Sequence, residues 1–408
     1  MSEVKEVPEI RFAGFTDDWK QRKVEELLIE RNEQTPMSEE YPLMAFIANE
    51  GVAPKGERYD RSSLVTDTEN KLYKRTEFGD FIYSSNNLET GSIGLNKYGK
   101  ACISPVYSIF QPTRIADSNF LGRRLVKKDF INSMIKWRQG VIYGQWRIHE
   151  SDFLKIEVPV PSVEEQRQIG TFLDCLDHLI ALHQRKHDKL VVLKKAMLEK
   201  MFPQNGSSVP EVRFAGFTSP WERQKVSELA DFSKGRGYSK GDLKEIGTPI
   251  ILYGRLYTKY QFEIGEVDTF ADIKPGSVFS KGDEVIVPAS GETAEDIAIA
   301  AAVVKPGILL GGDLNILHPF GFMNPSFVAL SISNGQPQKE LARKAQGKSV
   351  VHVHNSDIQE VTICYPDREE QDKIVSVFSQ LDNLITLHQR KHESLKRVKA
   401  ALLQKMFV

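Results

Sequence analysis

The amino-acid sequence predicts an α+β protein: two mixed α/β domains separated by two long antiparallel coiled-coil helices, in a tandem repeat with pseudo-twofold symmetry. Three observations predict this fold class. Two segments of the first half of the chain recur in the second half, one of them with a heptad pattern. The stretches between them contain the short apolar runs and turn residues that are typical of strands.

The repeat organises the whole chain of 408 residues. Residues 8–28, PEIRFAGFTDDWKQRKVEELL, return as residues 210–230, PEVRFAGFTSPWERQKVSELA, with 13 of 21 positions identical. Residues 164–202 return as residues 369–407, with 21 of 39 positions identical. The chain is therefore two half-chains in tandem. We predict a first domain over 1–161, a helix over 162–202, a linker over 203–209, a second domain over 210–366 and a second helix over 367–408.

Each predicted helix follows a proline and opens with a capping box, Ser162-x-x-Glu165 or Asp367-x-x-Glu370. Apolar residues then recur every seven positions over about five heptads, which is the pattern of a coiled coil. At 1.5 Å per residue each helix spans roughly 57 Å. An antiparallel pair of such helices would hold the two domains at opposite ends of a rod.

The motif LHQRKH occurs in the middle of both helices, at 182–187 and 387–392, and places His183 and His388 at core positions of the heptad pattern. In an antiparallel pairing the two imidazoles would meet near the centre and form a polar layer that sets the register. Metal binding by this pair is the alternative interpretation.

The inserts between the repeated segments, residues 30–140 and 232–345, show no sustained similarity to each other. Runs such as FGDFIYSSNN (78–87) and GDEVIVPAS (282–290) indicate strands and turns. A duplicated frame that carries two unlike inserts indicates that the protein recognises two different things at a fixed separation.

Composition indicates an ordinary globular protein, with 40% hydrophobic and 27% charged residues and a net charge of −1. The three cysteines, Cys102, Cys175 and Cys364, are far apart and form no disulfide framework, which is typical of a reducing compartment. The first residues are polar, and no uncharged apolar run is long enough to span a membrane. We therefore expect a cytoplasmic protein.

Several strings resemble catalytic motifs but lack the context that the chemistry needs. ARKAQGKS (342–349) resembles a phosphate-binding loop, yet a helix is expected before it and a strand after it, the reverse of the required order. Asn324 opens an NPSF string that lacks the second proline of the amino-methyltransferase motif. His352 and His354 share one face of a strand without a third metal ligand nearby in the sequence. We predict no catalytic residue, no bound cofactor and no metal in this chain.

Charge placement points to nucleic acid. The stretch 114–147 holds eight Lys or Arg residues against Asp117 and Asp129, and the stretch 336–352 holds four against Glu340. Both stretches lie at the C-terminal end of their insert, and such local excess suits contacts to phosphate groups. Aromatic and amide side chains are interleaved with the basic ones in the first stretch. A solvated basic face is the alternative interpretation.

Taken together, the frame RFAGFxxxW…KVxEL, the insert ends HESDFLKIEVPVP and HNSDIQEVTICYP, and the EEQxxI…LHQRKH helices closely resemble the specificity subunit of type I restriction-modification enzymes. The resemblance covers nearly the whole chain. It implies two target-recognition domains, each of which reads one half of an interrupted asymmetric sequence in double-stranded DNA. It also implies a chain without catalysis of its own that assembles with two modification subunits and two restriction subunits. S-adenosylmethionine, ATP and magnesium would then belong to those partner subunits.

The inserts are the variable part of that family, so the DNA-contacting residues are predicted here from residue type, because Arg, Asn, Gln and carboxylate side chains read base edges. For the first domain we predict Arg58, Asn86, Asn87, Thr90, Lys97, Trp137, Gln145 and Arg147. For the second we predict Arg236, Arg255, Tyr257, Ser290, Glu292, Thr293 and Lys348.

Two other functions fit the same residues. One is a DNA-binding protein that acts alone, without a methyltransferase partner. The other is a coiled-coil scaffold whose inserts bind proteins, which predicts no salt-dependent affinity for DNA.

Overall fold

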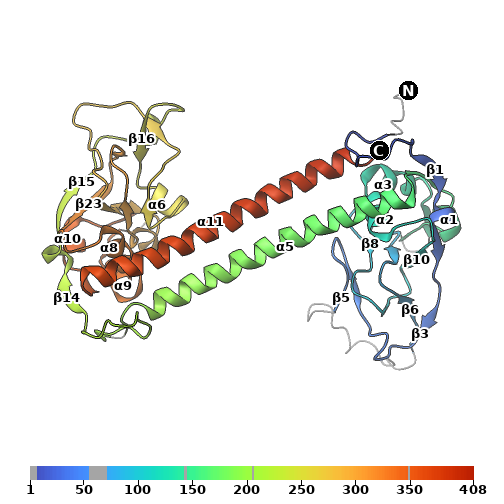
Figure 1. The fold of residues 1–408 in the computed structure, drawn as a ribbon, viewed down its shortest axis with the longest axis horizontal. Helices are drawn as coiled ribbons and strands as arrows, with labels where there is room; N and C mark the ends of the chain where they lie inside the picture. Colours follow the sequence, from blue (N-terminus) through green and yellow to red (C-terminus); the bar gives the residue numbers. More distant parts are fainter. Residues whose placement is uncertain (1–6, 55–70, 142–144, 205, 348–349) are drawn as a thin grey trace. The chain divides into compact units, whose positions relative to one another are not determined.

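The computed structural model describes residues 7–54, 71–141, 145–204, 206–347 and 350–408 (Figure 1). The chain divides into two compact units. Unit 1 contains Met1–His183 and Lys391–Val408, and unit 2 contains Gln184–Arg390. Each unit thus contains one insert and a part of both long helices. In the part of the chain that the structure describes, no helix is long and apolar enough to cross a membrane.

Unit 1 is built on a four-stranded antiparallel sheet in the order β2-β10-β7-β8. Smaller sheets flank it, and strand β1 of the frame pairs with β13. Its elements are β1 (Lys20–Lys23), α1 (Val24–Leu27), β2 (Leu28–Glu30), β3 (Gln34–Thr35), β4 (Ala45–Ile47), β5 (Gly51–Ala53), β6 (Tyr73–Thr76), β7 (Phe81–Tyr83), β8 (Ile93–Leu95), β9 (Ala101–Ile103), β10 (Ser108–Pro112), α2 (Ser118–Arg124), α3 (Lys128–Ile135), β11 (Gln139–Val141), β12 (Gln145–Arg147), α4 (Glu150–Phe153), β13 (Glu157–Val160), the start of α5 (Val163–Lys200) and the end of α11 (Arg368–Lys405).

Unit 2 is built on a five-stranded sheet in the order β15-β23-β19-β21-β17. Strand β14 pairs with β25, as β1 pairs with β13 in unit 1. Its elements are the end of α5, β14 (Glu222–Lys225), η4 (Val226–Glu228), β15 (Ala230–Lys234), η5 (Lys240–Asp242), β16 (Thr248–Ile251), α6 (Arg255–Thr258), β17 (Glu263–Ile264), β18 (Phe270–Ala271), β19 (Glu284–Pro288), β20 (Ser290–Gly291), α7 (Ala294–Ile297), β21 (Ala301–Val303), β22 (Leu309–Leu310), β23 (Leu314–Pro319), α8 (Pro325–Ile332), α9 (Gly335–Lys344), β24 (Val351–His352), α10 (Asn355–Gln359), β25 (Thr362–Tyr365) and the start of α11.

The two units share one strand order although their inserts are unlike in sequence. The run β2-β10-β7-β8 of unit 1 corresponds to β15-β23-β19-β21 of unit 2, and all these neighbours are antiparallel. Helices α2 and α3 correspond in chain order to α8 and α9. The predicted tandem repeat of α+β units is confirmed, and it extends to the fold of the inserts.

Aromatic side chains build the core of unit 1. Phe153 of α4 lies against three rings of the central sheet, with centroid distances of 6.0 Å to Phe81, 4.9 Å to Tyr83 and 4.7 Å to Phe110. Burial of such rings from both a helix and a sheet supplies most of the favourable free energy of folding. The short helix α4 therefore ties the segment before it to the sheet.

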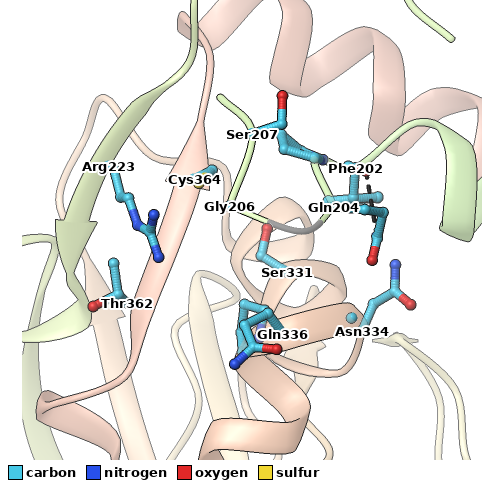
Figure 2. Close-up of a pocket in the computed structure, with 13 residues that line it drawn as sticks. Phe202, Gln204, Gly206, Ser207, Arg223, Ser331, Asn334, Gln336, Thr362 and Cys364 are labelled. Carbon is cyan, nitrogen blue, oxygen red and sulfur yellow. Dashed lines mark hydrogen bonds between the residues drawn. The ribbon is translucent and has the colours of Figure 1, made fainter. Parts of the chain in front are cut away.

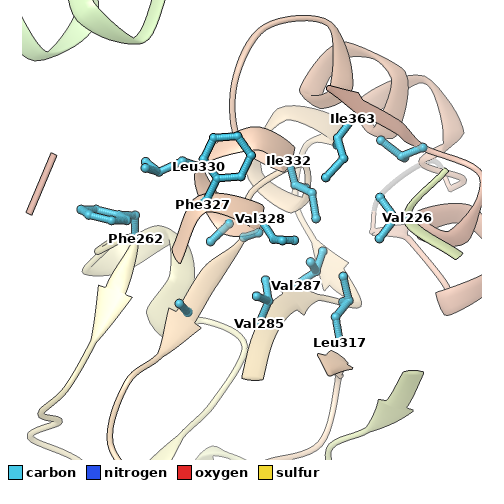
Figure 3. Packing of buried hydrophobic residues seen from close by; sticks show 14 of the residues in the cluster. Val226, Phe262, Val285, Val287, Leu317, Phe327, Val328, Leu330, Ile332 and Ile363 are labelled. Carbon is cyan, nitrogen blue, oxygen red and sulfur yellow. The ribbon is translucent and has the colours of Figure 1, made fainter. Parts of the chain in front are cut away.

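In unit 2 the core lies between the sheet and helix α8. Figure 3 shows Phe327, Val328 and Ile332 of α8 next to Val285 and Leu317 of the sheet. The interior positions of this helix are buried all around, which explains why the run FVALSI is apolar without a polar face.

Both long helices have 38 residues, as the heptad pattern predicts. The backbone N–H of Glu165 donates to the Ser162 hydroxyl (3.3 Å), and that of Glu370 to the Asp367 carboxylate (2.9 Å). The glutamate half of each predicted capping box has another partner, because both carboxylates accept hydrogen bonds from an arginine of the frame.

Within unit 1 the start of α5 packs against the end of α11, where Lys399 forms an ion pair with Asp177. Within unit 2 the end of α5 packs against the start of α11, where Lys194 lies 2.5 Å from Asp382. The two helices therefore run antiparallel. His183 belongs to unit 1 and His388 to unit 2, so the polar layer between them stays a prediction.

Candidate nucleic-acid interface

In unit 1 the turn between β7 and β8 holds the β-hairpin β11–β12. The Asn86 side-chain oxygen accepts the backbone N–H of Trp146 (2.6 Å), and the Ser85 hydroxyl accepts that of Ile148 (3.0 Å). These bonds satisfy the backbone donors of Trp146 in β12 and of Ile148 directly after it, because no other strand of the described residues pairs with β12 on this side. The structure therefore brings together two segments that lie about 60 residues apart in the sequence.

The other strand of the hairpin is held by charge. Arg138, directly before β11, donates two hydrogen bonds to the Glu89 carboxylate of the same turn (2.9 and 2.7 Å), and this guanidinium lowers the pKa of Glu89. Thr90 is exposed and donates its hydroxyl to the Asn87 carbonyl. The turn and the hairpin thus form one surface, which we call the unit 1 reading surface: residues 84–92 and the described residues of 137–147.

Three of the predicted residues point outward from this surface. Asn87 is exposed, and 41% of Trp137 is accessible, with the Lys155 ammonium 6.0 Å from its ring. Arg147 has 57% of its side chain exposed and lies 3.8 Å from Glu150. Burial alone would raise the pKa of Glu150, but the hydrogen bond from Ser108 and nearby cations leave it lowered, so the carboxylate stays ionised beside Arg147.

Other candidates in the first half lie elsewhere. Lys97 forms an ion pair with Asp174 of α5 at 3.2 Å, on the helix side of the unit. Gln145 is in β12, opposite Val141 in the hairpin register. Arg58 lies outside the described residues.

The basic stretch 114–147 is partly neutralised within unit 1. Arg123 contacts Asp174 (2.6 Å) and Asp177 (2.9 Å), and Arg124 is buried against Asp129. Together with Arg138 and Arg147, four of the eight basic residues of this stretch form internal ion pairs. The charge excess that remains for a polyanion is therefore smaller than the sequence count indicates.

In unit 2 the corresponding turn follows β19. Strand β20 of this turn pairs with β24, and the Ser290 hydroxyl lies 3.2 Å from Nδ1 of His352. The backbone N–H of Val353 donates to the Ala289 carbonyl (3.1 Å), as Ile148 donates to the first turn. We call residues 289–296 with Gln346 and 351–352 the unit 2 reading surface. It occupies the same place in the unit 2 topology as the first reading surface does in unit 1.

Glu292 and Thr293 both lie exposed on this second surface. Thr293 caps helix α7, where its hydroxyl accepts the N–H of Asp296 (3.1 Å). The phenol of Tyr257 is close to the same turn. Burial and the neighbouring Tyr253 raise its pKa, and the carboxylates of Glu292 and Asp296 add to this shift.

The two arginines predicted in the second half differ in their surroundings. Arg255 has 12% of its side chain exposed and donates to Asp268 (3.0 Å), Gln261 (3.1 Å) and the Glu266 carbonyl (3.2 Å), so its guanidinium holds a loop together. Arg236 is exposed, at the turn after β15. Lys348 lies outside the described residues.

The strings that resemble catalytic motifs have structural roles. Asn324 caps α8 and accepts the N–H groups of Ser326 and Phe327. His354 caps α10 through its backbone N–H, which donates to Asp357 (2.8 Å). Among the residues that the structure describes, no three His, Cys, Asp or Glu side chains are grouped to hold a metal ion.

A hollow in unit 2 lies where the linker meets the start of α9 and strand β25. Figure 2 shows Phe202, Gln204 and Ser207 of the linker region, Asn334 and Gln336 at α9, and Cys364 around it. Its volume of about 40 Å³ suits ordered water and is far below the size of a small-molecule site.

Comparison with known proteins decides the family. Residues 16–191 and 322–397, more than half of the chain, match the model of the type I restriction modification DNA specificity domain. The chain belongs to this family. The matched residues include 16–28 of the first frame segment and most of both long helices, which confirms the resemblance seen in the sequence.

Relatives of this specificity protein extend the match. The type I restriction enzyme MjaVIII specificity subunit of Methanocaldococcus jannaschii is 23% identical over 79% of this chain and 77% of its own length. The putative MjaX specificity subunit of the same organism is 23% identical over 64% of this chain and 60% of its own length. The crystal structure of the type I S subunit from M. genitalium has the same fold, with a TM-score of 0.59, 14% identity and coverage of 98% of this chain and 99% of that one.

Residue-type reasoning missed parts of both reading surfaces. Trp146 and His352 stand directly on the strands that meet the two turns. Glu89 and Ser85 hold the first surface without any motif to mark them. Their signal in the sequence is positional: each reading strand comes shortly before the HxSD segment that the two halves share (149–152 and 354–357).

Proposed function

We propose that this chain is the DNA-recognition subunit of a type I restriction-modification enzyme and that each unit reads one half of an interrupted asymmetric target. One observation carries the proposal. The two reading surfaces occupy equivalent places in two units of the same strand order, yet their exposed side chains differ. Equivalent placement with unlike chemistry is what a protein needs to read two different sequences.

The chemistry of each surface suits base edges. The unit 1 reading surface exposes Asn87 and Arg147, and amide and guanidinium groups read adenine and guanine in the major groove. The unit 2 reading surface exposes Glu292, whose carboxylate can accept a hydrogen bond from the amino group of cytosine. The two half-sites should therefore differ in base composition.

Catalysis belongs to partners in this proposal. Two modification subunits, which use S-adenosylmethionine to methylate adenine, and two restriction subunits, which use ATP and magnesium, complete the enzyme. The specificity chain supplies the sequence information, and its antiparallel helices set the distance between the half-sites.

The frame offers the modification subunits a surface that occurs twice. The RFAGFT segments at 11–16 and 213–218 are identical in sequence and alternate between half-buried and exposed positions in the same order. Exposed positions just beyond them have diverged, for example Asp18 against Pro220 and Lys20 against Glu222. A surface that is the same in both halves cannot read two different DNA sequences. It suits one protein that binds in two copies.

Substitutions in the two RFAGFT segments test this docking surface. Ala13→Glu and Ala215→Glu each introduce a charge at an exposed position, while Asp18→Ala at a diverged position is the matched control. Native mass spectrometry of the complex purified with its modification subunit should show one copy lost in each single variant and both lost in the double variant. Two retained copies in both single variants would contradict this docking surface.

The proposed function is tested by single-molecule methylome sequencing of cells that express the modification subunit with or without this chain. We expect N6-methyladenine at one interrupted motif that disappears when the chain is absent. Soluble complex without any new motif would contradict the proposal and favour the scaffold alternative.

A further inference from the structure

The chain has four tryptophans, and they divide into two pairs. Trp19 and Trp221 are equivalent frame residues, 2% and 3% exposed, and fill the cores of the two units. Trp137 and Trp146 are 41% and 48% exposed, and both belong to the unit 1 reading surface. Exposing a ring of this size is unfavourable in the free protein unless a partner covers it.

Trp146 is exposed on a rigid support. Its backbone N–H is bound to Asn86 (2.6 Å), the next buried residue Ile148 is bound to Ser85, and Arg138 ties the opposite strand to Glu89. These hydrogen bonds therefore hold the backbone that carries the Trp146 side chain before any ligand arrives. Such pre-organisation lowers the entropy cost of binding.

Gly140 of the opposite strand has no side chain that could cover the ring. Trp146 lies opposite Gly140 in the hairpin register, and a Cβ atom added to Gly140 would meet no atom within 4 Å. A glycine at this position leaves the indole open on the side where a neighbouring side chain would normally pack. The ring has the geometry of an exposed stacking platform.

We propose that Trp146 inserts its indole into the base stack of the half-site read by unit 1, beside the adenine that the partner subunit methylates. This inference rests on the proposed function. A methyltransferase must turn its target base out of the duplex, which leaves a gap in the stack. Apolar side chains held at a DNA surface fill such gaps and stabilise the opened step.

This inserting side chain is a feature of unit 1 and not of unit 2. The equivalent position in unit 2, two residues before the buried Val353, is Val351, which has no π-face to stack on a base. An abasic site in the unit 2 half-site is therefore an internal control for one in the unit 1 half-site.

The test uses the complete complex with its modification subunit and duplexes that carry the methylated motif. A duplex with an abasic site in place of the target adenine already has the gap. We expect the native chain to bind the duplex with the unit 1 abasic site more tightly than the intact duplex, and the Trp146→Ala chain to show no such gain. On intact DNA, Trp146→Ala should weaken binding by roughly 5- to 150-fold, the range for loss of one base-stacking ring, whereas Trp146→Phe should keep most of the affinity.

Fluorescence separates insertion from a general loss of structure. In a Trp137→Phe chain the only tryptophan exposed among the described residues is Trp146, so binding of cognate DNA should quench its emission, and the quenching should vanish in Trp137→Phe/Trp146→Phe. Two results would contradict the insertion of Trp146 and leave the proposed function standing. One is tight binding of DNA without quenching. The other is an equal increase in affinity for the abasic duplex in the native and Trp146→Ala chains. A complex that binds no DNA at all would overturn both.

Discussion

The guanidinium of Arg11 holds the buried carboxylate of Glu165 through two hydrogen bonds of 2.7 Å, and Glu165 is only 1% exposed. Arg213 holds Glu370 in the same way, at 2.7 and 2.8 Å. Each pair fastens the segment before an FAGF turn to the first turn of a long helix. The repeat thus preserves a buried ion pair that positions the frame on the helices.

Removal of the cation should strongly destabilise unit 2. Arg213→Met leaves the Glu370 carboxylate buried without its partner, and we expect a loss of about 3–5 kcal/mol in the free energy of unfolding. Urea denaturation measures this loss. The double variant Arg213→Met/Glu370→Leu should recover much of it, and Arg22→Met, which breaks an exposed pair with Glu26, should cost about 1 kcal/mol or less. Equal losses in the buried and exposed variants would contradict this role.

The stability that Asp174 of α5 contributes to unit 1 should depend on pH. Burial raises the pKa of Asp174, but the hydrogen bond and charge of Arg123 and the charge of Lys97 outweigh this effect and leave the pKa lowered. A lowered folded-state pKa stabilises the fold above the unfolded-state value, about 3.9, and this contribution is lost as the pH falls through the folded value. The stability difference between the native chain and Asp174→Ser should therefore be full at pH 6 and shrink below about pH 4. Serine is the residue at the equivalent position 379. A difference that stays constant with pH would show that the carboxylate charge plays no part.

Glu292 should specify one base pair of the half-site read by unit 2. Its amide variant, Glu292→Gln, both donates and accepts, so we expect discrimination at one position to fall by about 1–3 kcal/mol. Methylome sequencing would show the motif relaxed at that position. Glu245→Gln, at an exposed position of unit 2 outside the unit 2 reading surface, is the matched control and should leave the motif unchanged. Relaxation in the other half-site would contradict the assignment of Glu292 to this surface.

The helices should act as a spacer between the half-sites. One heptad inserted into both α5 and α11 lengthens each by about 10.5 Å, which is about three base pairs of DNA. The unread part of the motif should widen by about that number while both half-sites stay the same. A spacer of unchanged length would mean that the helices do not set the distance.

The sequence predicted the frame well because its signals are local or repeated. The heptads, the Ser162 and Asp367 caps and the identical RFAGFT segments each point to one structure, and the helices Val163–Lys200 and Arg368–Lys405 lie inside the predicted ranges 162–202 and 367–408. The inserts were harder to predict because most of their strands have only two to five residues and pair with strands far away in the sequence. Their common strand order has no signature in the amino acids.

The candidate site was predictable in region but not in detail. Asn86 and Ser290 were predicted from residue type, and the structure places them in the two turns that meet β12 and β24. Their contact with DNA stays a prediction. Residue type does not reveal that the side-chain oxygen of Asn86 accepts a hydrogen bond from the Trp146 backbone N–H. Nor does it reveal that Arg255 and Lys97 have carboxylate partners. Such pairings depend on backbone register, which the sequence does not display.

The most direct test of the central claim, that each insert reads its half-site independently, is a chain with the same insert in both halves. Residues 30–160 are replaced by residues 232–365, and the methylome is sequenced in cells that express this variant with the modification subunit. We predict a motif in which the half-site read by unit 2 occurs twice, inverted about the spacer as the pseudo-twofold repeat requires, and the half-site read by unit 1 is lost. Retention of the original asymmetric motif, or two half-sites that both differ from the original ones, would contradict the account.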